Sequence, residues 1–166
     1  MVLRPARPPD ALAVAGIHVR AWQTGYRGLL PDGYLDGLRA EDRARRYTFD
    51  VTDPDRPQTL VAELDGAIVG FATTAPAEAE PGAGELAALH VDPPAWRRGI
   101  GGALITAARA RLVDRGFTSA VLWLLAGNRR AEAFYRADGW AAEGEPRGAE
   151  VWGTHVEEIR FRRALP

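Results

Sequence analysis

The segment with the clearest chemical potential spans residues 91–102 and reads Val-Asp-Pro-Pro-Ala-Trp-Arg-Arg-Gly-Ile-Gly-Gly. It joins a strand-like apolar run to an amphipathic helical pattern. The first N–H groups of a helix have no partner within it, and the helix dipole adds positive charge there, so this turn suits a phosphate. Its glycines allow close approach to the main chain, and Arg97 and Arg98 add charge-assisted donors. The alternative is a plain strand-to-helix connection.

Two other phosphate-binding signatures are excluded by single features of the chain. A dinucleotide-binding fingerprint requires a third glycine, but Leu104 stands at that position. A P-loop requires a Gly-Lys-Ser/Thr run, whereas all 21 basic residues are arginine. The turn is therefore expected to bind phosphate in a different structural context.

A second motif lies downstream at residues 128–135, Asn-Arg-Arg-Ala-Glu-Ala-Phe-Tyr, and closes with Gly139-Trp140. Together the two segments resemble the acyl-CoA signature of the GCN5-related N-acetyltransferases, the GNAT family. In that family Arg/Gln-x-x-Gly-x-Gly/Ala follows a strand, and an Asn-x-x-Ala-x-x-Phe-Tyr segment comes later. One position departs from the pattern, because Trp96 stands where arginine or glutamine is usual. This change should be tolerated, since most phosphate contacts in such a turn come from the main chain.

The resemblance implies acetyl-CoA as co-substrate and no metal. The pyrophosphate is expected on the N–H groups of residues 98–102. The pantetheine arm, which carries two amides, is expected to pair with the exposed edge of the strand that ends at Val91. Asn128 is expected to help hold this arm, and the alternative is an ordinary helix N-cap. The implied contacts are Leu89, Val91, Arg97, Arg98, Gly99, Ile100, Gly101, Gly102, Asn128, Ala131 and Tyr135.

Acetyl transfer to an amine requires a neutral nucleophile, a stabilised oxyanion and protonation of the departing thiolate. Tyr135 resembles the family's tyrosine near the CoA sulfur, where a phenol can donate a proton or a hydrogen bond. A main-chain N–H near Val91 is expected to stabilise the oxyanion. Family members that acetylate ribosomal-protein N-termini carry a glutamate where this chain has Trp123. That leaves Glu85 as the expected base, through a water, with His90 as a second candidate whose orientation the sequence leaves open.

In this family the acceptor is selected by the first helices and by the loop between the last two strands. Trp22 and Tyr26 are the expected substrate contacts on the helices. The loop carries Glu143, Glu145 and Glu150, and an aromatic, acidic rim suits a cationic amine. The alternative is a core tryptophan with solvated glutamates.

The elements that position these residues follow from hydrophobic periodicity and turn signals. Strands are expected at residues 2–5, 59–64, 67–74, 85–91, 119–125, 140–142 and 154–162, with a hairpin turn at Asp65-Gly66. A helix is expected at 11–24, with Asp10 as N-cap and an apolar stripe of Leu12, Ala15, Val19 and Trp22. Further helices are expected within 32–49, from the glycine turn to Arg115, and from Asn128 to Asp138. The order predicts an α+β fold. By resemblance, it is a mixed, mostly antiparallel sheet of about seven strands with helices on both faces and a splayed central strand pair.

Composition narrows the class of protein further. The 166 residues are 46% hydrophobic with a net charge of -1, which predicts a single domain over residues 1–166 without general affinity for nucleic acid. The chain has no cysteine, and its three histidines show no spacing typical of a metal site. No apolar run approaches the roughly 20 residues that span a bilayer, and the first residues do not resemble a signal peptide. A cytoplasmic protein without membrane contact is expected.

The sequence thus predicts an acetyl-CoA-dependent N-acetyltransferase that acts by direct transfer, because no cysteine is available for an acyl-enzyme. The favoured acceptor is a primary amine on a small molecule. A peptide or protein N-terminus is the alternative acceptor, and a non-catalytic acyl-CoA-binding regulatory domain is the alternative class. The sequence leaves open whether the chain forms a homodimer.

Overall fold

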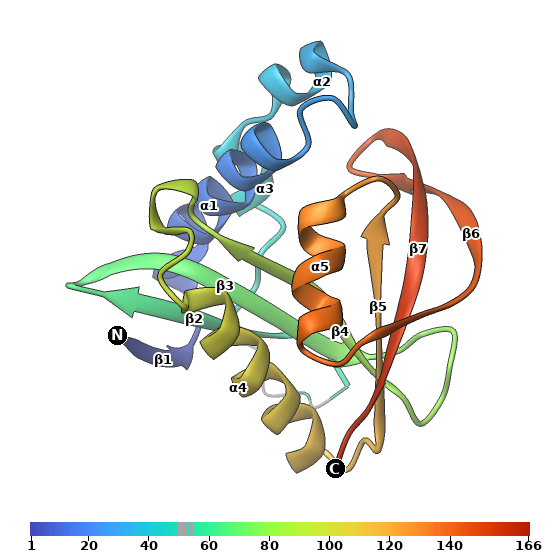
Figure 1. Ribbon diagram of the computed structural model, residues 1–166. Coiled ribbons are helices and arrows are strands. Elements are labelled where there is room, and N and C mark those ends of the chain that lie inside the picture. Colours follow the sequence, from blue (N-terminus) through green and yellow to red (C-terminus); the bar gives the residue numbers. More distant parts are fainter. Residues whose placement is uncertain (50–52, 54) are drawn as a thin grey trace.

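The computed structural model describes residues 1–49, 53 and 55–166, which form a seven-stranded sheet with helices on both faces (Figure 1). The strand order is β1-β2-β3-β4-β5-β7-β6, and only β4 and β5 pair in parallel among the described residues. The strands are β1 (Val2–Pro5), β2 (Gln58–Leu64), β3 (Ala67–Pro76), β4 (Gly84–Val91), β5 (Ser119–Leu125), β6 (Ala141–Val151) and β7 (Thr154–Ala164). The helices are α1 (Ala11–Gly25), α2 (Asp32–Gly37), α3 (Ala40–Ala44), α4 (Ile100–Asp114) and α5 (Arg129–Ala137), with short 3-10 turns η1 (Pro8–Asp10) and η2 (Pro93–Ala95). The expected α+β fold is confirmed.

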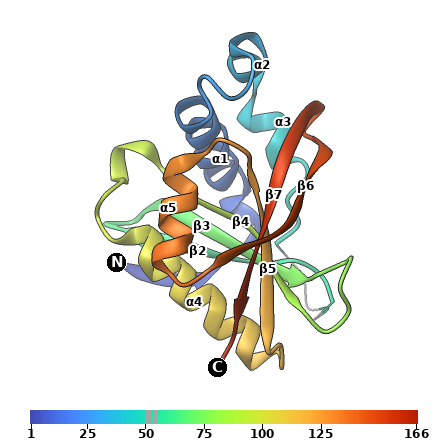
Figure 2. The same cartoon turned by 45° about the vertical axis from the view of Figure 1, so that its right-hand side comes forward.

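The sheet buries a different set of side chains on each face. In the β2–β3 hairpin, Val61 and Phe71 pack with residues of α1, whereas Ala62 and Ala72 pack beneath α4. Figure 2 shows α4 and α5 on one face and α1 on the other. The predicted hairpin turn at Asp65-Gly66 is confirmed by positive φ angles of 52° and 80°, as a type I′ turn requires.

The two central strands separate soon after they meet. β4 and β5 pair only at Gly84 with Ala120 and at Glu85 with Val121, and Figure 1 shows them diverging beyond that point. The β3 register shifts between Thr73 and Thr74, which leaves Ala87 as an extra residue on β4. Such a bulge bends a strand and increases its twist, so it helps β4 turn away from β5. The splayed strand pair implied by the sequence is therefore present.

Two sequence-based expectations need correction. β6 runs from Ala141 to Val151 rather than ending at Ala142, so the three glutamates expected in a loop lie on a strand. The strand was missed because its residues are polar or small: it pairs only with β7 at the edge of the sheet and buries little apolar surface. Leu12, expected on the buried stripe of α1, is 56% exposed, whereas Val14 and Ile17 are buried.

The α1–α2 region packs against the end of the β6–β7 hairpin. Trp22, Leu30 and Leu35 form a buried cluster with Val156 of β7. This cluster encloses one side of the space between β4 and β5. None of the helices in the described residues is both long and apolar enough to cross a membrane.

Candidate functional site

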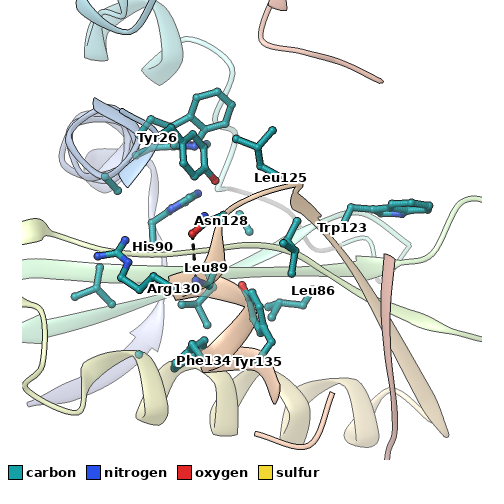
Figure 3. Close-up of a pocket in the computed structure, with 18 of the residues that line it drawn as sticks. Tyr26, Leu86, Leu89, His90, Trp123, Leu125, Asn128, Arg130, Phe134 and Tyr135 are labelled. Atoms are coloured by element: carbon teal, nitrogen blue, oxygen red, sulfur yellow. Dashed lines mark hydrogen bonds between the residues drawn. The ribbon is translucent and has the colours of Figure 1, made fainter. Parts of the chain in front are cut away.

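A cavity of about 990 Å³ lies where β4 and β5 diverge. Its wall includes residues 86–91 of β4 and 123–125 of β5, the glycine turn, and parts of α1, α3, α5 and the β6–β7 hairpin. Pockets that bind small ligands typically measure about 300–1,000 Å³. Figure 3 shows side chains from β4, β5, α1 and α5 converging on this space.

The glycine turn has the backbone geometry of an anion cradle. Gly99 adopts the left-handed conformation, with φ of 79°, immediately before α4 begins at Ile100. A Cβ added at Gly102 would meet nothing within 4 Å, so that position opens toward the cavity. A Cβ added at Gly101 would lie 3.3 Å from Cε2 of Phe134. Gly101 therefore allows α4 to approach α5, while Gly102 leaves the helix N-terminus accessible.

The edge of β4 that faces the gap offers main-chain groups. The N–H of Asp92 donates to the carbonyl of Val69 on β3, at 2.9 Å. Because hydrogen-bonding groups alternate from side to side along a strand, Val91 and Leu89 direct theirs toward the gap. Beyond Glu85 no residue of β5 pairs with this edge within the described part of the chain.

Trp96, the departure from the family pattern, binds the end of this strand. Its indole Nε1 donates to the carbonyl oxygen of Val91 at 2.7 Å. The guanidinium of Arg130, at the start of α5, lies over its ring at 3.5 Å. Trp96 thus connects the glycine turn, β4 and α5. This role differs from the one expected of an arginine or glutamine at the same position, which would donate to the phosphate.

Two residues of the second motif face the cavity from α5. Asn128 caps the helix, because its side-chain oxygen accepts a hydrogen bond from the N–H of Ala131 at 3.1 Å. Two turns later, the Tyr135 hydroxyl points into the cavity, and Tyr26 approaches from the C-terminal end of α1 (Figure 3). Burial raises the pKa of Tyr26 to about 12 and also raises the pKa of Tyr135 above its usual value. Both phenols therefore keep their protons at neutral pH.

His90 points toward α1, on the opposite face from α4, which resolves the orientation that the sequence left open. Its ring stacks on that of His18 with centroids 4.5 Å apart, and His18 stacks in turn on Trp152 at 4.3 Å. Burial, with smaller effects from Arg43 and Arg130, lowers the pKa of His90 to about 4. The imidazole is therefore neutral at physiological pH.

Most of the expected site residues meet at the cavity. Of the site residues expected from the sequence, those that line the cavity are Trp22, Tyr26, Leu89, Val91, Arg97, Gly99, Ile100, Gly101, Gly102, Asn128, Ala131 and Tyr135. Arg98 is exposed and does not line it. Glu85 lies outside the lining, where β4 and β5 are still paired, about 20 Å along the strand from Val91. Desolvation by burial raises the pKa of the Glu85 carboxyl.

The expected acidic rim does not form as predicted. Of the three β6 glutamates, only Glu150 lines the cavity. Glu143 pairs with Arg160 and Arg162, and Glu145 does not reach the lining. Within the described residues, no group of three or more histidine, cysteine, aspartate or glutamate side chains could hold a metal ion.

A sequence model of the acetyltransferase (GNAT) family matches residues 19–140, which include both motifs. The chain belongs to the GNAT acetyltransferase family. It is 29% identical over 162 residues to the uncharacterized N-acetyltransferase YuaI of Bacillus subtilis, covering 96% of this chain and 90% of that protein. It is 27% identical over 172 residues to the probable N-acetyltransferase Rv2775 of Mycobacterium tuberculosis, covering 96% and 91%. This GNAT protein is thus an acyltransferase.

Solved structures share the fold of this GNAT acetyltransferase. A crystal structure of the PaiA N-acetyltransferase from Thermoplasma acidophilum in complex with coenzyme A superimposes with a TM-score of 0.76. The two sequences are 17% identical, and the match covers 98% of each chain. A GCN5-related N-acetyltransferase from Rhodopseudomonas palustris gives a TM-score of 0.78 at 22% identity, covering 99% of this chain and 95% of that one.

Other residues of this GNAT acetyltransferase line the cavity without having been expected there. Among them are Arg43 of α3, Trp152 between β6 and β7, and Glu158 of β7. Trp152 and Gly153 both have positive φ, at 55° and 76°, and form the hairpin turn. The glycine after Trp152 was the one signal that could have indicated this turn. Nothing in the local sequence links Arg43 or Glu158 to the site, because strand pairing and helix packing bring them there.

Proposed function

We propose that residues 1–166 act as a single acetyl-CoA-dependent N-acetyltransferase domain that acetylates a primary amine on a small molecule. The observation that carries the proposal is the open edge of β4 beside the helix N-terminus of α4. A strand edge with free amide groups suits the two amides of pantetheine, and an open helix N-terminus suits the pyrophosphate. Both lead into one cavity of about 990 Å³.

The residues present fit acetyl-CoA as follows. The main-chain groups of Leu89 would hold the pantetheine arm, with Asn128 beside it, and the N–H of Val91 would face the thioester at the end of that arm. The N–H groups at Gly101 and Gly102 would hold the pyrophosphate, with Arg97 at the rim. When bound, acetyl-CoA supplies an activated acetyl group that passes to the amine nitrogen as the bond from carbon to sulfur breaks.

The oxyanion and the leaving group call for hydrogen-bond donors. The N–H of Val91 faces the gap, and the strand end is held by the bond from Trp96 to the Val91 carbonyl. A donor fixed in this way can stabilise negative charge on the acetyl oxygen without reorganising. Tyr135 keeps its proton at neutral pH and points into the cavity, so it can donate to the departing sulfur.

The proton of the amine needs an acceptor. Glu85, the carboxylate expected from the sequence, would need a relay of waters because it lies outside the cavity lining. His90 lines the cavity on the α1 side and is neutral, so its ring can accept a hydrogen bond from the incoming amine. We therefore assign to His90 the hydrogen bond that orients the incoming amine, while the proton itself passes to solvent.

Thiol release from acetyl-CoA in the presence of an acceptor panel tests the proposal. The panel contains small primary amines and peptides with free N-termini, and binding of CoA is measured separately by the rise in melting temperature. Release with small amines supports the proposed acceptor class, and release with peptides alone favours the alternative acceptor. Stabilisation by CoA without release from any acceptor would instead indicate a non-catalytic acyl-CoA-binding domain.

A further inference from the structure

We propose that the amine acceptor carries a carboxylate, and that Arg43 binds this carboxylate on the α1 side of the cavity. The inference rests on the proposed acetyl transfer to a small amine. It names the class of acceptor: an amino acid or another amine with an attached carboxylate.

The proposed carboxylate site lies where α1, α3 and the tip of the β6–β7 hairpin meet, which Figure 2 shows on the side of the sheet away from α4. Here the ring of His18 stacks between His90 and Trp152. The guanidinium of Arg43 lies over the ring of Trp152, with its Cζ atom 4.0 Å from the ring centre. Arg43 is thus joined to the reacting end of the cavity by a continuous column of packed rings.

Arg43 is a lining cation that is not neutralised within the described residues. Within those residues, its guanidinium lies over the rings of Trp152 and Tyr47, and its Nε donates a long hydrogen bond of 3.5 Å to the Tyr47 hydroxyl. No ion pair joins it to a carboxylate of the described chain. A half-buried guanidinium with free terminal N–H groups matches a carboxylate in charge and geometry.

The carboxylates of the cavity wall, in contrast, already have partners. Glu158 accepts hydrogen bonds from Arg147 at 3.1 and 3.2 Å. Glu150 lies 3.3 Å from a ring nitrogen of His155 and is largely exposed, and an imidazole partner does not remove its charge. Among the lining residues of the α1 side, the two cations Arg43 and Arg46 outweigh this one carboxylate, so the balance of charge is positive. This favours an anionic group on the acceptor over a second cationic one.

Trp22 forms part of the aromatic wall beside Arg43. Its side chain is 6% exposed and lines the cavity, and its ring centre is 4.7 Å from that of Trp152, the residue on which Arg43 lies. Its indole nitrogen is buried and has no hydrogen-bond partner among the described residues, so it is not reached from the cavity. Arg43 is therefore the side-chain donor that this wall offers to a carboxylate.

Matched pairs of amines that differ by one carboxylate test the inference. L-Phenylalanine is compared with phenethylamine, and 4-aminobutyrate with propylamine, by the kcat/KM of thiol release. We expect at least one carboxylate-bearing amine to be preferred by about tenfold or more over its partner. Arg43→Gln should remove this preference by raising KM for the carboxylate-bearing amine, with little change for the partner, and Arg43→Lys should restore part of it.

Arg45→Gln is the matched control, because Arg45 lies two residues away, is exposed and pairs with Asp42. It should leave the preference unchanged. Melting temperatures of all variants report whether the fold is retained, and Arg43→Lys supplies the test if Arg43→Gln unfolds.

Two results would overturn the inference while leaving the acetyl transfer intact. One is faster thiol release with the decarboxylated partner in both pairs. The other is a preference for carboxylate that Arg43→Gln and Arg45→Gln leave equally unchanged. If no amine releases thiol, acetyl transfer fails, and calorimetry with L-phenylalanine and 4-aminobutyrate in the presence of CoA decides the carboxylate site. Binding that Arg43→Gln weakens supports it, and absence of binding overturns it.

Discussion

Replacing Gly102 by alanine should stabilise the folded protein and weaken its binding of CoA. Gly102 is the third residue of α4, and a Cβ built there meets no atom within 4 Å. Alanine is favoured over glycine in a helix by up to about 1 kcal/mol, because glycine loses more backbone entropy on folding. For a chain of this size, that corresponds to a rise in melting temperature of roughly 2–4 °C.

The same methyl group should oppose the ligand. Position 102 lines the cavity at the helix N-terminus, and the pyrophosphate can reach the main-chain N–H groups only if this space stays open. Losing one hydrogen bond to a charged group costs about 1.5–3 kcal/mol, which is roughly a 10- to 150-fold increase in Kd. Thermal unfolding measures the first effect, and calorimetric titration with CoA measures the second.

Two other glycines complete the comparison. Gly33 of α2 also has nothing within 4 Å of an added Cβ but does not line the cavity, so Gly33→Ala should raise the melting temperature without changing the Kd. Gly101→Ala places its Cβ 3.3 Å from the Phe134 ring, so crowding should offset its helical gain. If Gly102→Ala binds CoA as tightly as the unmodified protein, the phosphates do not lie at this helix terminus.

Three more outcomes follow from the site. Tyr135→Phe should lower kcat at least about tenfold with little change in CoA affinity, because only the donor is lost; equal losses in both would argue against a role at the leaving group. Trp96→Phe should lower the free energy of unfolding in urea by about 1 kcal/mol, since the Val91 carbonyl loses its indole donor, and an unchanged value would show that this bond adds nothing. His90 alone should lower the free energy of unfolding by roughly 3 kcal/mol as the pH drops from 6.5 to 4, because the unfolded chain protonates His90 near 6.5 and the folded protein only near about 4. Denaturant titrations across this range should show a smaller decrease for His90→Phe, and equal decreases would contradict the assignment.

The half of the cavity proposed to hold acetyl-CoA could be anticipated because backbone geometry determines it, and local residue types determine backbone geometry. Gly99 adopts the left-handed conformation that ends the turn, and Asn128 caps α5 through a hydrogen bond three residues along the chain. Such interactions join residues close together in the chain, so the residue types occur at a recognisable spacing in the sequence. The same is true of Asp65-Gly66, whose positive φ angles close the β2–β3 hairpin.

The acceptor half could not be anticipated in the same way. Arg43, His18 and Trp152 come from three distant parts of the sequence and meet only after α3 packs on α1 and the β6–β7 hairpin folds over both. β6 lacks the alternation of apolar residues that reveals a strand, because it is an exposed edge strand. Glu85 shows the converse error. It lies on β4 itself, but at the end that is still paired with β5, and the sequence does not indicate which end of the strand is open.

The brief pairing of β4 with β5 has a consequence for the durability of the enzyme. Two pairs of residues join the four-stranded and three-stranded halves of the sheet, so the seam between them is the place where the native structure should open first, and amide exchange there should be fast. A molecule that bridges the seam binds the native state and not the unfolded one, and it therefore stabilises the fold by mass action. If acetyl-CoA is that molecule, the lifetime of the folded enzyme depends on the concentration of its own co-substrate.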